Sequence, residues 1–186
     1  MPRRTENAND DALETTMDTA APSGAPPAAG TLGAVSAGIG LGANLGDCAA
    51  TLRQALQAIA ALPGTQLLRH SSLYRSAPVA ATGPDYVNAV AEILTTLSPQ
   101  ALLQALQHLE HAAGRERPYR NAPRTLDLDI LWWDDLHLAT PTLTVPHPCM
   151  HERAFVLVPL AEIAPQRVTP ERLRAVQGQR VERLEE

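Results

Sequence analysis

Two aspartates lie two residues apart in the segment 125–130, directly after a loop that carries four arginines. The segment alternates polar and apolar residues, which predicts a β-strand with Asp127 and Asp129 on one face and three aliphatic residues facing a core. Two carboxylates one strand repeat apart lie roughly 7 Å apart at Cα, close enough to bind the same hard cations. Arginine is a bidentate phosphate ligand, and Mg²⁺ binds through one or two carboxylates plus substrate phosphates. The pattern therefore predicts a site for Mg²⁺ and a nucleotide polyphosphate.

The arginine loop decides between this interpretation and a simpler one. An Asp-Leu-Asp strand also occurs as the solvated face of an ordinary sheet. The four arginines fall within ten residues of a loop interrupted by prolines, so they serve neither a helix nor a core: Arg115, Arg117, Arg120 and Arg124. Such a loop is either an exposed mobile segment or a clamp for an anion. The neighbouring aspartates favour the clamp.

Histidines elsewhere in the chain allow two interpretations. His147 and His151, with a cysteine between them, suggest zinc, but they lack the paired spacing of a structural zinc site. The same holds for His108 and His111, which we expect on the solvated side of a helix. His147, with Arg153 downstream, either donates to a phosphate or is an ordinary loop residue.

Tyr86 and Asn88 alternate on a predicted strand and therefore face the same side. They are either a half-buried tyrosine with a polar neighbour or a surface for a flat heterocycle, stacked on the ring and read by the amide. Phe155, the only phenylalanine in the chain, is the candidate for the opposite ring.

Composition excludes several functions. The 15 basic residues are all arginine, and a Walker A loop needs a lysine, so the chain is not a P-loop NTPase. The net charge of −5 disfavours nucleic acid as a partner. Gly38, Gly40, Gly42 and Gly46 lack the G-x-G-x-x-G spacing of a dinucleotide site, and we interpret them as residues that let the chain turn tightly.

The chain shows no sign of export or of membrane insertion. Its N-terminal segment is acidic on balance and lacks an apolar run, so we expect neither a transit peptide nor a secretory signal. No stretch approaches the about 20 apolar residues of a membrane span. We therefore expect a cytoplasmic protein with no membrane partner, in which Cys48 and Cys149 are free thiols.

Periodicity and turn residues predict one α/β domain over residues 32–170. A disordered tail precedes it at 1–31, and a polar C-terminal helix or tail follows at 171–186. We expect helices at about 47–62 and 98–114, with Asp47 and Ser98 as N-caps. We expect strands at 35–41, 66–75, 86–95, 125–130 and 143–145. The order β-α-β-β-α-β is typical of a ferredoxin-like sandwich, an antiparallel sheet with helices on one face.

The chain from about Ser36 to Pro165 resembles the 6-hydroxymethyl-7,8-dihydropterin pyrophosphokinases of folate biosynthesis. The segments that carry the resemblance are 42–46 (Gly-Ala-Asn-Leu-Gly), 71–76 (Ser-Ser-Leu-Tyr-Arg-Ser), 85–88 (Asp-Tyr-Val-Asn), 114–115, 123–130 (Pro-Arg-Thr-Leu-Asp-Leu-Asp-Ile) and 143–147 (Leu-Thr-Val-Pro-His), continuing through Arg153 and Phe155. The Pro-Arg-Thr-Leu-Asp-Leu-Asp segment is highly specific to that family. The resemblance also implies a ferredoxin-like α/β sandwich.

The resemblance implies transfer of pyrophosphate from MgATP to the hydroxymethyl group of the dihydropterin, with release of AMP. It implies catalytic roles for Arg115, Arg124, Asp127 and Asp129, the two aspartates holding two Mg²⁺ ions. The implied ATP-binding residues are Gln107, Glu110, Arg115, Arg117, Arg124, Ile130, Thr144, His147 and Arg153. The implied pterin-binding residues are Ser76, Ala77, Val79, Tyr86, Asn88 and Phe155. The partners are then these two small molecules, and we expect a monomer.

The chain departs from well-studied members of that family at several positions. Asn121 stands where some members carry a tryptophan that closes over the pterin, and the arginine loop is one residue shorter and has no lysine. Ala77 replaces a common proline, and Thr142 replaces an arginine. Asn121 and the altered loop leave one alternative, a pterin or nucleotide sensor of the same ancestry. A second alternative is a ferredoxin-like interaction module, with the N-terminal tail as a partner-binding segment and the charges as solvated surface.

Overall fold

The computed structural model describes residues 33–79, 83–115 and 122–185. The predicted tail at 1–31, Arg117, Arg120 and Asn121 all lie outside these ranges. The strands are β1 (Val35–Ala43), β2 (Thr65–His70), β3 (Tyr74–Ser76), β4 (Tyr86–Thr95), β5 (Asp127–Trp133), β6 (Leu138–Ala139), β7 (Thr144–Val145) and β8 (Val181–Arg183). The helices are α1 (Cys48–Ala60), α2 (Pro99–Ala112), α3 (Ala154–Ile163), the 3₁₀ turn η1 (Pro165–Arg167) and α4 (Pro170–Ala175).

The protein has a mixed α/β fold built on an antiparallel sheet. Its strand order is β5-β1-β4-β3-β8, and β2 also pairs with β4. β1 is central and pairs antiparallel with both β4 and β5. The ladder places Gly42 opposite both Asn88 on β4 and Asp127 on β5. Three predicted functional segments therefore meet at one end of the sheet.

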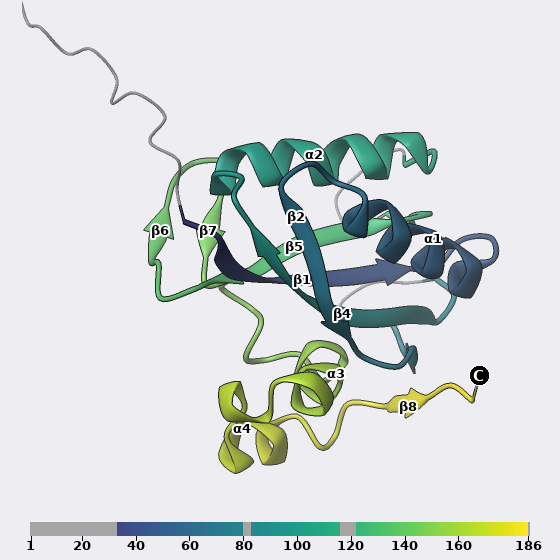
Figure 1. Ribbon diagram of the computed structural model, residues 1–186. Helices are drawn as coiled ribbons and strands as arrows, with labels where there is room; N and C mark the ends of the chain where they lie inside the picture. The colour runs from purple at the N-terminus through teal and green to yellow at the C-terminus, as the bar shows by residue number, and fades with distance from the viewer. Residues whose placement is uncertain (1–32, 80–82, 116–121, 186) are drawn as a thin grey trace, which may run out of the picture. The chain divides into compact units, whose positions relative to one another are not determined.

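Helices α1 and α2 cover one face of this sheet (Figure 1). Each begins at the predicted cap, because the side chain of Asp47 accepts from the N–H of Ala50 and that of Ser98 accepts from the N–H of Ala101. Aliphatic side chains of both helices pack with the core face of β1, β4 and β5, and this is the larger hydrophobic core. Ile130 lies in that core, which confirms the predicted alternation along β5.

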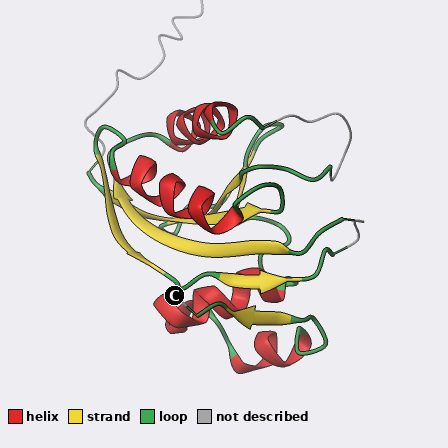
Figure 2. Ribbon diagram, turned by 90° about the vertical axis from the view of Figure 1, so that its right-hand side faces the viewer, coloured by secondary structure: helices red, strands yellow, loops and turns green. Residues whose placement is uncertain are grey.

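Helix α3 covers the opposite face with α4 packed against it (Figure 2), so the expectation that helices cover only one face is wrong. A second core lies there, formed by Val90, Leu131 and Trp132 of the sheet with aliphatic residues of α3 and the following segment. Helix α3 is apolar nearly all round because the sheet, η1 and α4 all pack against it.

The predicted strand 66–75 is two strands separated by a short break. The Ser71 N–H donates to the carbonyl of Val90, and the Val90 N–H donates to the Ser71 hydroxyl, 3.0 Å away. The Ser71 hydroxyl thus accepts the bond that a main-chain carbonyl would accept in a regular strand pair, and the chain bends before β3 begins. The sequence also did not indicate β8. This strand lies in the segment 171–186, which was expected to be a polar helix or tail, and it pairs with β3. None of the helices in the described ranges combines the length and the hydrophobicity needed to cross a bilayer.

Candidate active site

A cavity of about 320 Å³ opens where β1, β3, β4 and β5 meet the start of α3. This volume is in the usual range for small-molecule sites. Eleven of the predicted site residues line it: Ser76, Ala77, Val79, Tyr86, Asn88, Arg124, Asp127, Asp129, His147, Arg153 and Phe155. The structure thus brings the predicted phosphate-binding and pterin-binding residues into one cavity.

The two predicted metal ligands lie on the cavity face of β5, with arginines around them. Both oxygens of Asp127 are paired, because Oδ1 lies 2.7 Å from Arg115 Nη2 and Oδ2 lies 2.9 Å from Arg124 Nη1. The Nε atoms of Arg115 and Arg124 are buried and have no hydrogen-bond partner within the described ranges. Arg115 and Arg124 are therefore both paired with one carboxylate, and each has a further N–H that makes no hydrogen bond within the described ranges.

Asp129, unlike Asp127, makes no ion pair with another residue of the described ranges. Burial raises the pKa of its carboxyl above the ordinary value, and the negative charge of Asp127 raises it further. His147 and Arg153 counter part of this shift. A divalent cation would relieve both the desolvation and the repulsion, so the carboxylate pair fits Mg²⁺. Within the described ranges no third carboxylate, histidine or cysteine joins them, so phosphate oxygens and water would complete the coordination.

Glu110 supports the arginine clamp from behind. Its carboxylate is buried, pairs with the guanidinium of Arg115 and accepts a 2.7 Å hydrogen bond from the N–H of Leu128. Since Leu128 lies between the two aspartates, one carboxylate on α2 fixes both the clamp and the strand. Glu110 therefore has a structural part in the site although it does not line the cavity.

Two aromatic rings and a side-chain amide also line the cavity. Asn88 is buried, and its Nδ2 donates to the Ser76 hydroxyl at 2.9 Å and to the Tyr74 carbonyl at 3.3 Å. These bonds fix the orientation of the amide beside β3. Phe155 has the Arg153 guanidinium 5.5 Å from its ring centre, and Tyr86 has that of Arg124 at 6.0 Å. Both rings thus stand beside phosphate-binding candidates.

Two further polar residues, His147 and Asn44, make hydrogen bonds to the main chain near the cavity. The Nδ1 of His147 accepts from the N–H of Cys149, so the neutral ring carries its proton on Nε2 as a donor. The side chain of Asn44 accepts from the N–H of Arg124 at 2.7 Å and donates to the carbonyl of Pro84. Asn44 therefore joins the arginine segment to the chain before β4.

The glycines of β1 make room for the cavity. Gly38, Gly40 and Gly42 lie within the strand and not in a turn, which corrects their interpretation as turn residues. A methyl group on Gly38 would come within 2.0 Å of the Trp132 ring, and one on Gly40 within 3.2 Å of Leu131. Gly40 and Gly42 line the cavity. Glycine recurs at every second residue from 38 to 42, and this spacing could have indicated a strand with one face free of side chains.

Five predicted site residues in the described ranges do not line the cavity: Gln107, Glu110, Arg115, Ile130 and Thr144. The Ile130 side chain is 3% exposed and packs in the core on the other face of the sheet, so only its main chain could meet a nucleotide. Gln107 on α2 and Thr144 on β7 are exposed. His108 and His111 are exposed, as expected. Arg117 is outside the described ranges.

An antiparallel α/β fold with a cavity lined by two aspartates, arginines and two aromatic rings fits the class of α/β transferases that act on phosphate-rich substrates. Residues 38–165 match the family described as 7,8-dihydro-6-hydroxymethylpterin-pyrophosphokinase (HPPK). The chain belongs to this family and is a pyrophosphokinase of folate biosynthesis.

Individual relatives agree with this assignment. The chain is 48% identical over 137 residues to the 2-amino-4-hydroxy-6-hydroxymethyldihydropteridine pyrophosphokinase of Haemophilus influenzae, covering 73% of this chain and 86% of that one. It is 45% identical over 153 residues to the Pseudomonas aeruginosa enzyme of the same name, covering 78% and 94%. The wild-type HPPK-DHPS of Plasmodium falciparum superimposes with a TM-score of 0.54 at 13% identity. That match covers 69% of this chain but only 41% of the other, and it shows the fold alone.

Proposed function

We propose that this protein transfers the β,γ-pyrophosphate of MgATP to the hydroxymethyl oxygen of 6-hydroxymethyl-7,8-dihydropterin. The observation that carries the proposal is a cavity whose lining combines the carboxylate pair and Arg124 with two aromatic rings and the Asn88 amide. The hydroxymethyl oxygen bonds to the β-phosphorus and loses its proton to water. The bond from the β-phosphorus to the α,β-bridging oxygen breaks, and AMP leaves with that oxygen.

In this proposal Asp127 and Asp129 hold two Mg²⁺ ions. When bound, these ions neutralise charge on the triphosphate and orient it for in-line attack. A cation at Asp127 competes with its two arginine partners, and an arginine that it displaces becomes available to the phosphates. The protein thus exchanges one set of ion pairs for another as the nucleotide binds, and no buried charge is left without a partner.

Arg115, Arg124, His147 and Arg153 supply donors for the triphosphate, which is the role for which planar arginine is suited. Gln107, Glu110, Ile130 and Thr144 belong to the nucleotide side of the site in this proposal, and Ile130 acts through its main chain. The arrangement stabilises charge without a covalent protein intermediate.

The pterin is proposed to lie between Tyr86 and Phe155. Asn88 reads its amide edge, together with the segment from Ser76 to Val79. A ring with the wrong donors and acceptors would leave buried polar groups such as the Asn88 amide without partners, and this supplies the selectivity.

Several broader assignments belong to the same proposal. We propose a ferredoxin-like topology, which the order β5-β1-β4-β2 with α1 and α2 on one face supports. We also propose that the enzyme acts as a monomer in the cytoplasm. Its partners are then MgATP and the dihydropterin, with no nucleic acid involved.

The test follows the label from ATP that carries ³²P in the γ position. The proposal expects AMP and labelled pterin diphosphate in equal amounts, only when the reduced pterin and Mg²⁺ are both present. ADP in place of AMP would mean attack at the γ-phosphorus and would contradict the proposed reaction. Binding of MgATP without any nucleotide product would identify a sensor.

A further inference from the structure

Gln179, beyond the segment that matches the family, binds the main chain on both sides of Arg153. Its Oε1 accepts from the N–H of Ala154 at 2.9 Å, and its Nε2 donates to the carbonyl of Glu152 at 2.8 Å. The Gln179 amide therefore binds the residue before Arg153 and the residue after it. The family match ends at residue 165.

This contact replaces a cap that α3 lacks. Arg153 is the N-cap residue, and its side chain makes no capping hydrogen bond. The first N–H groups of a helix need acceptors from outside the helix. Gln179 supplies one from 25 residues further along the chain. The position at which α3 begins, and with it the position of Arg153 and Phe155 at the cavity wall, depends on a residue of the C-terminal segment.

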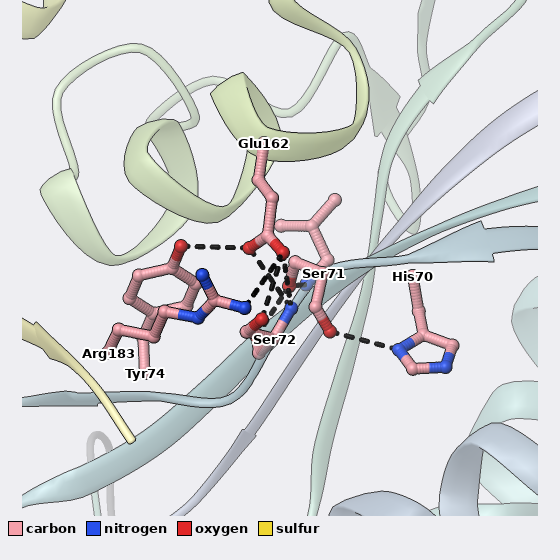
Figure 3. A network of polar contacts seen from close by, with 7 residues as sticks. His70, Ser71, Ser72, Tyr74, Glu162 and Arg183 are labelled. Atoms are coloured by element: carbon pink, nitrogen blue, oxygen red, sulfur yellow. Dashed lines mark hydrogen bonds and ion pairs between the residues drawn. The ribbon is translucent and has the colours of Figure 1, made fainter. Parts of the chain in front are cut away.

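The other end of α3 is held mainly by β3 and the residues just before it. Figure 3 shows the Glu162 carboxylate reaching Ser72 and Tyr74, with Arg183 of β8 beside it. The Tyr74 hydroxyl donates to Glu162 at 2.8 Å, and the Ser72 hydroxyl donates at 2.9 Å. Burial and this carboxylate raise the pKa of Tyr74 to about 12, so the hydroxyl keeps its proton at neutral pH. Because the far end is held, loosening the Gln179 contact frees only the start of the helix.

Other contacts of this segment are weaker candidates. Arg180 pairs with Asp85 at 2.9 Å, next to Tyr86, but both side chains are largely exposed. Exposed pairs of this kind contribute little. Gln179 is half-buried, and its two bonds bind main-chain groups at the start of α3, so it is the stronger candidate.

We propose that Gln179 is a positioning residue for Arg153 and sets the affinity for MgATP through it. The inference rests on the proposed function, since that assigns Arg153 to the triphosphate. It gives the C-terminal segment a part in substrate binding, beyond completion of the sheet by β8.

A double-mutant cycle tests this inference. Calorimetry on the full chain gives the Kd of Mg²⁺ with a non-transferable ATP analogue for the wild type, Gln179→Ala, Arg153→Ala and the double variant. Losing two hydrogen bonds is expected to weaken binding about five- to tenfold in Gln179→Ala. The double variant is expected to bind no more weakly than Arg153→Ala alone, because the residue through which Gln179 acts is already absent. The matched control is Gln177→Ala, an exposed glutamine two residues away, with no expected change.

Gln179→Met keeps the volume of the side chain and carries the test if the alanine variant does not fold. Unchanged affinity in a folded Gln179 variant, or losses that add in the double variant, would overturn the inference. Wild-type protein that binds no analogue would contradict the proposed function itself, and the inference with it. Wild-type binding with an unaffected Gln179 variant would contradict the inference alone.

Discussion

Replacing Glu110 by alanine tests whether the arginine clamp is held from behind. The Glu110 and Arg115 side chains are both only 5% exposed where they pair. The same carboxylate accepts from the buried N–H of Leu128, between the two aspartates. Glu110→Ala removes both interactions at once. Arg115 keeps Asp127 as a partner, so the variant loses one carboxylate of two.

The magnitude follows from what is left unpaired. Breaking a buried ion pair by removing one partner costs about 3–5 kcal/mol. Part of the expected decrease in unfolding free energy, about 1–3 kcal/mol, comes from the Leu128 N–H, which is left without an acceptor. Arg115 still pairs with Asp127 in this variant. We therefore expect the unfolding free energy to fall by about 3–4 kcal/mol, the lower part of the range for a broken buried ion pair. At about 2–4 °C per kcal/mol for a domain of this size, the melting temperature should fall by about 10 °C.

Urea unfolding followed by circular dichroism measures this difference. The matched controls are Glu110→Gln, which keeps one acceptor oxygen and should lose about half as much, and Gln104→Ala on the exposed side of α2. Glu110→Ala should also weaken MgATP binding, because Arg115 is no longer oriented. An unfolding free energy within about 1 kcal/mol of the wild type would refute the reasoning.

Three further predictions concern residues around the cavity. The raised pKa of Asp129 means that the folded state holds this proton more tightly than the unfolded chain, so stability is lost as the pH rises through the raised pKa. Asp129→Asn should therefore raise the unfolding free energy of the ligand-free protein at neutral pH, with no gain below the ordinary pKa of 3.8. Gly38→Ala should cost about 1–3 kcal/mol or more in urea unfolding, because the new methyl group overlaps Trp132. Asn44→Ala should weaken MgATP binding about tenfold in calorimetry, because Arg124 loses a 2.7 Å contact.

Each of these predictions has its own control. A gain in Asp129→Asn that is equal at low and neutral pH would show that the stabilisation does not come from ionisation. Gly178→Ala, where an added methyl group meets nothing within 4 Å, should leave stability nearly unchanged. Asn44→Asp retains an acceptor oxygen for the Arg124 N–H, and the Asn44 account fails if it binds MgATP as weakly as the alanine variant.

Local patterns predicted the parts of the fold that depend on neighbouring residues. The alternation around Asp127 and Asp129 fixed one strand face, and Asp47 and Ser98 identified the helix starts, because caps act within three residues. The strand Tyr86–Thr95 has the predicted bounds. The resemblance to a known family then indicated which of these segments meet in one cavity.

Features that depend on distant partners were not predictable in the same way. The break at Ser71 arises from a hydrogen bond to Val90, 19 residues away. Strand β8 forms because it pairs with the free edge of β3. Its own sequence is short and polar and gives no strand pattern. The role of Gln179 needs the position of α3, which no local pattern gives.

The most direct test of the central claim is the rate of Mg²⁺-dependent AMP formation by Asp127→Asn, measured beside the wild type with reduced hydroxymethylpterin present. The control is Asp135→Asn, an exposed aspartate in the turn after β5. The account predicts wild-type rates for the control and no AMP above background for Asp127→Asn in a folded protein. AMP formation by Asp127→Asn at the wild-type rate would contradict the assignment of this cavity as the active site.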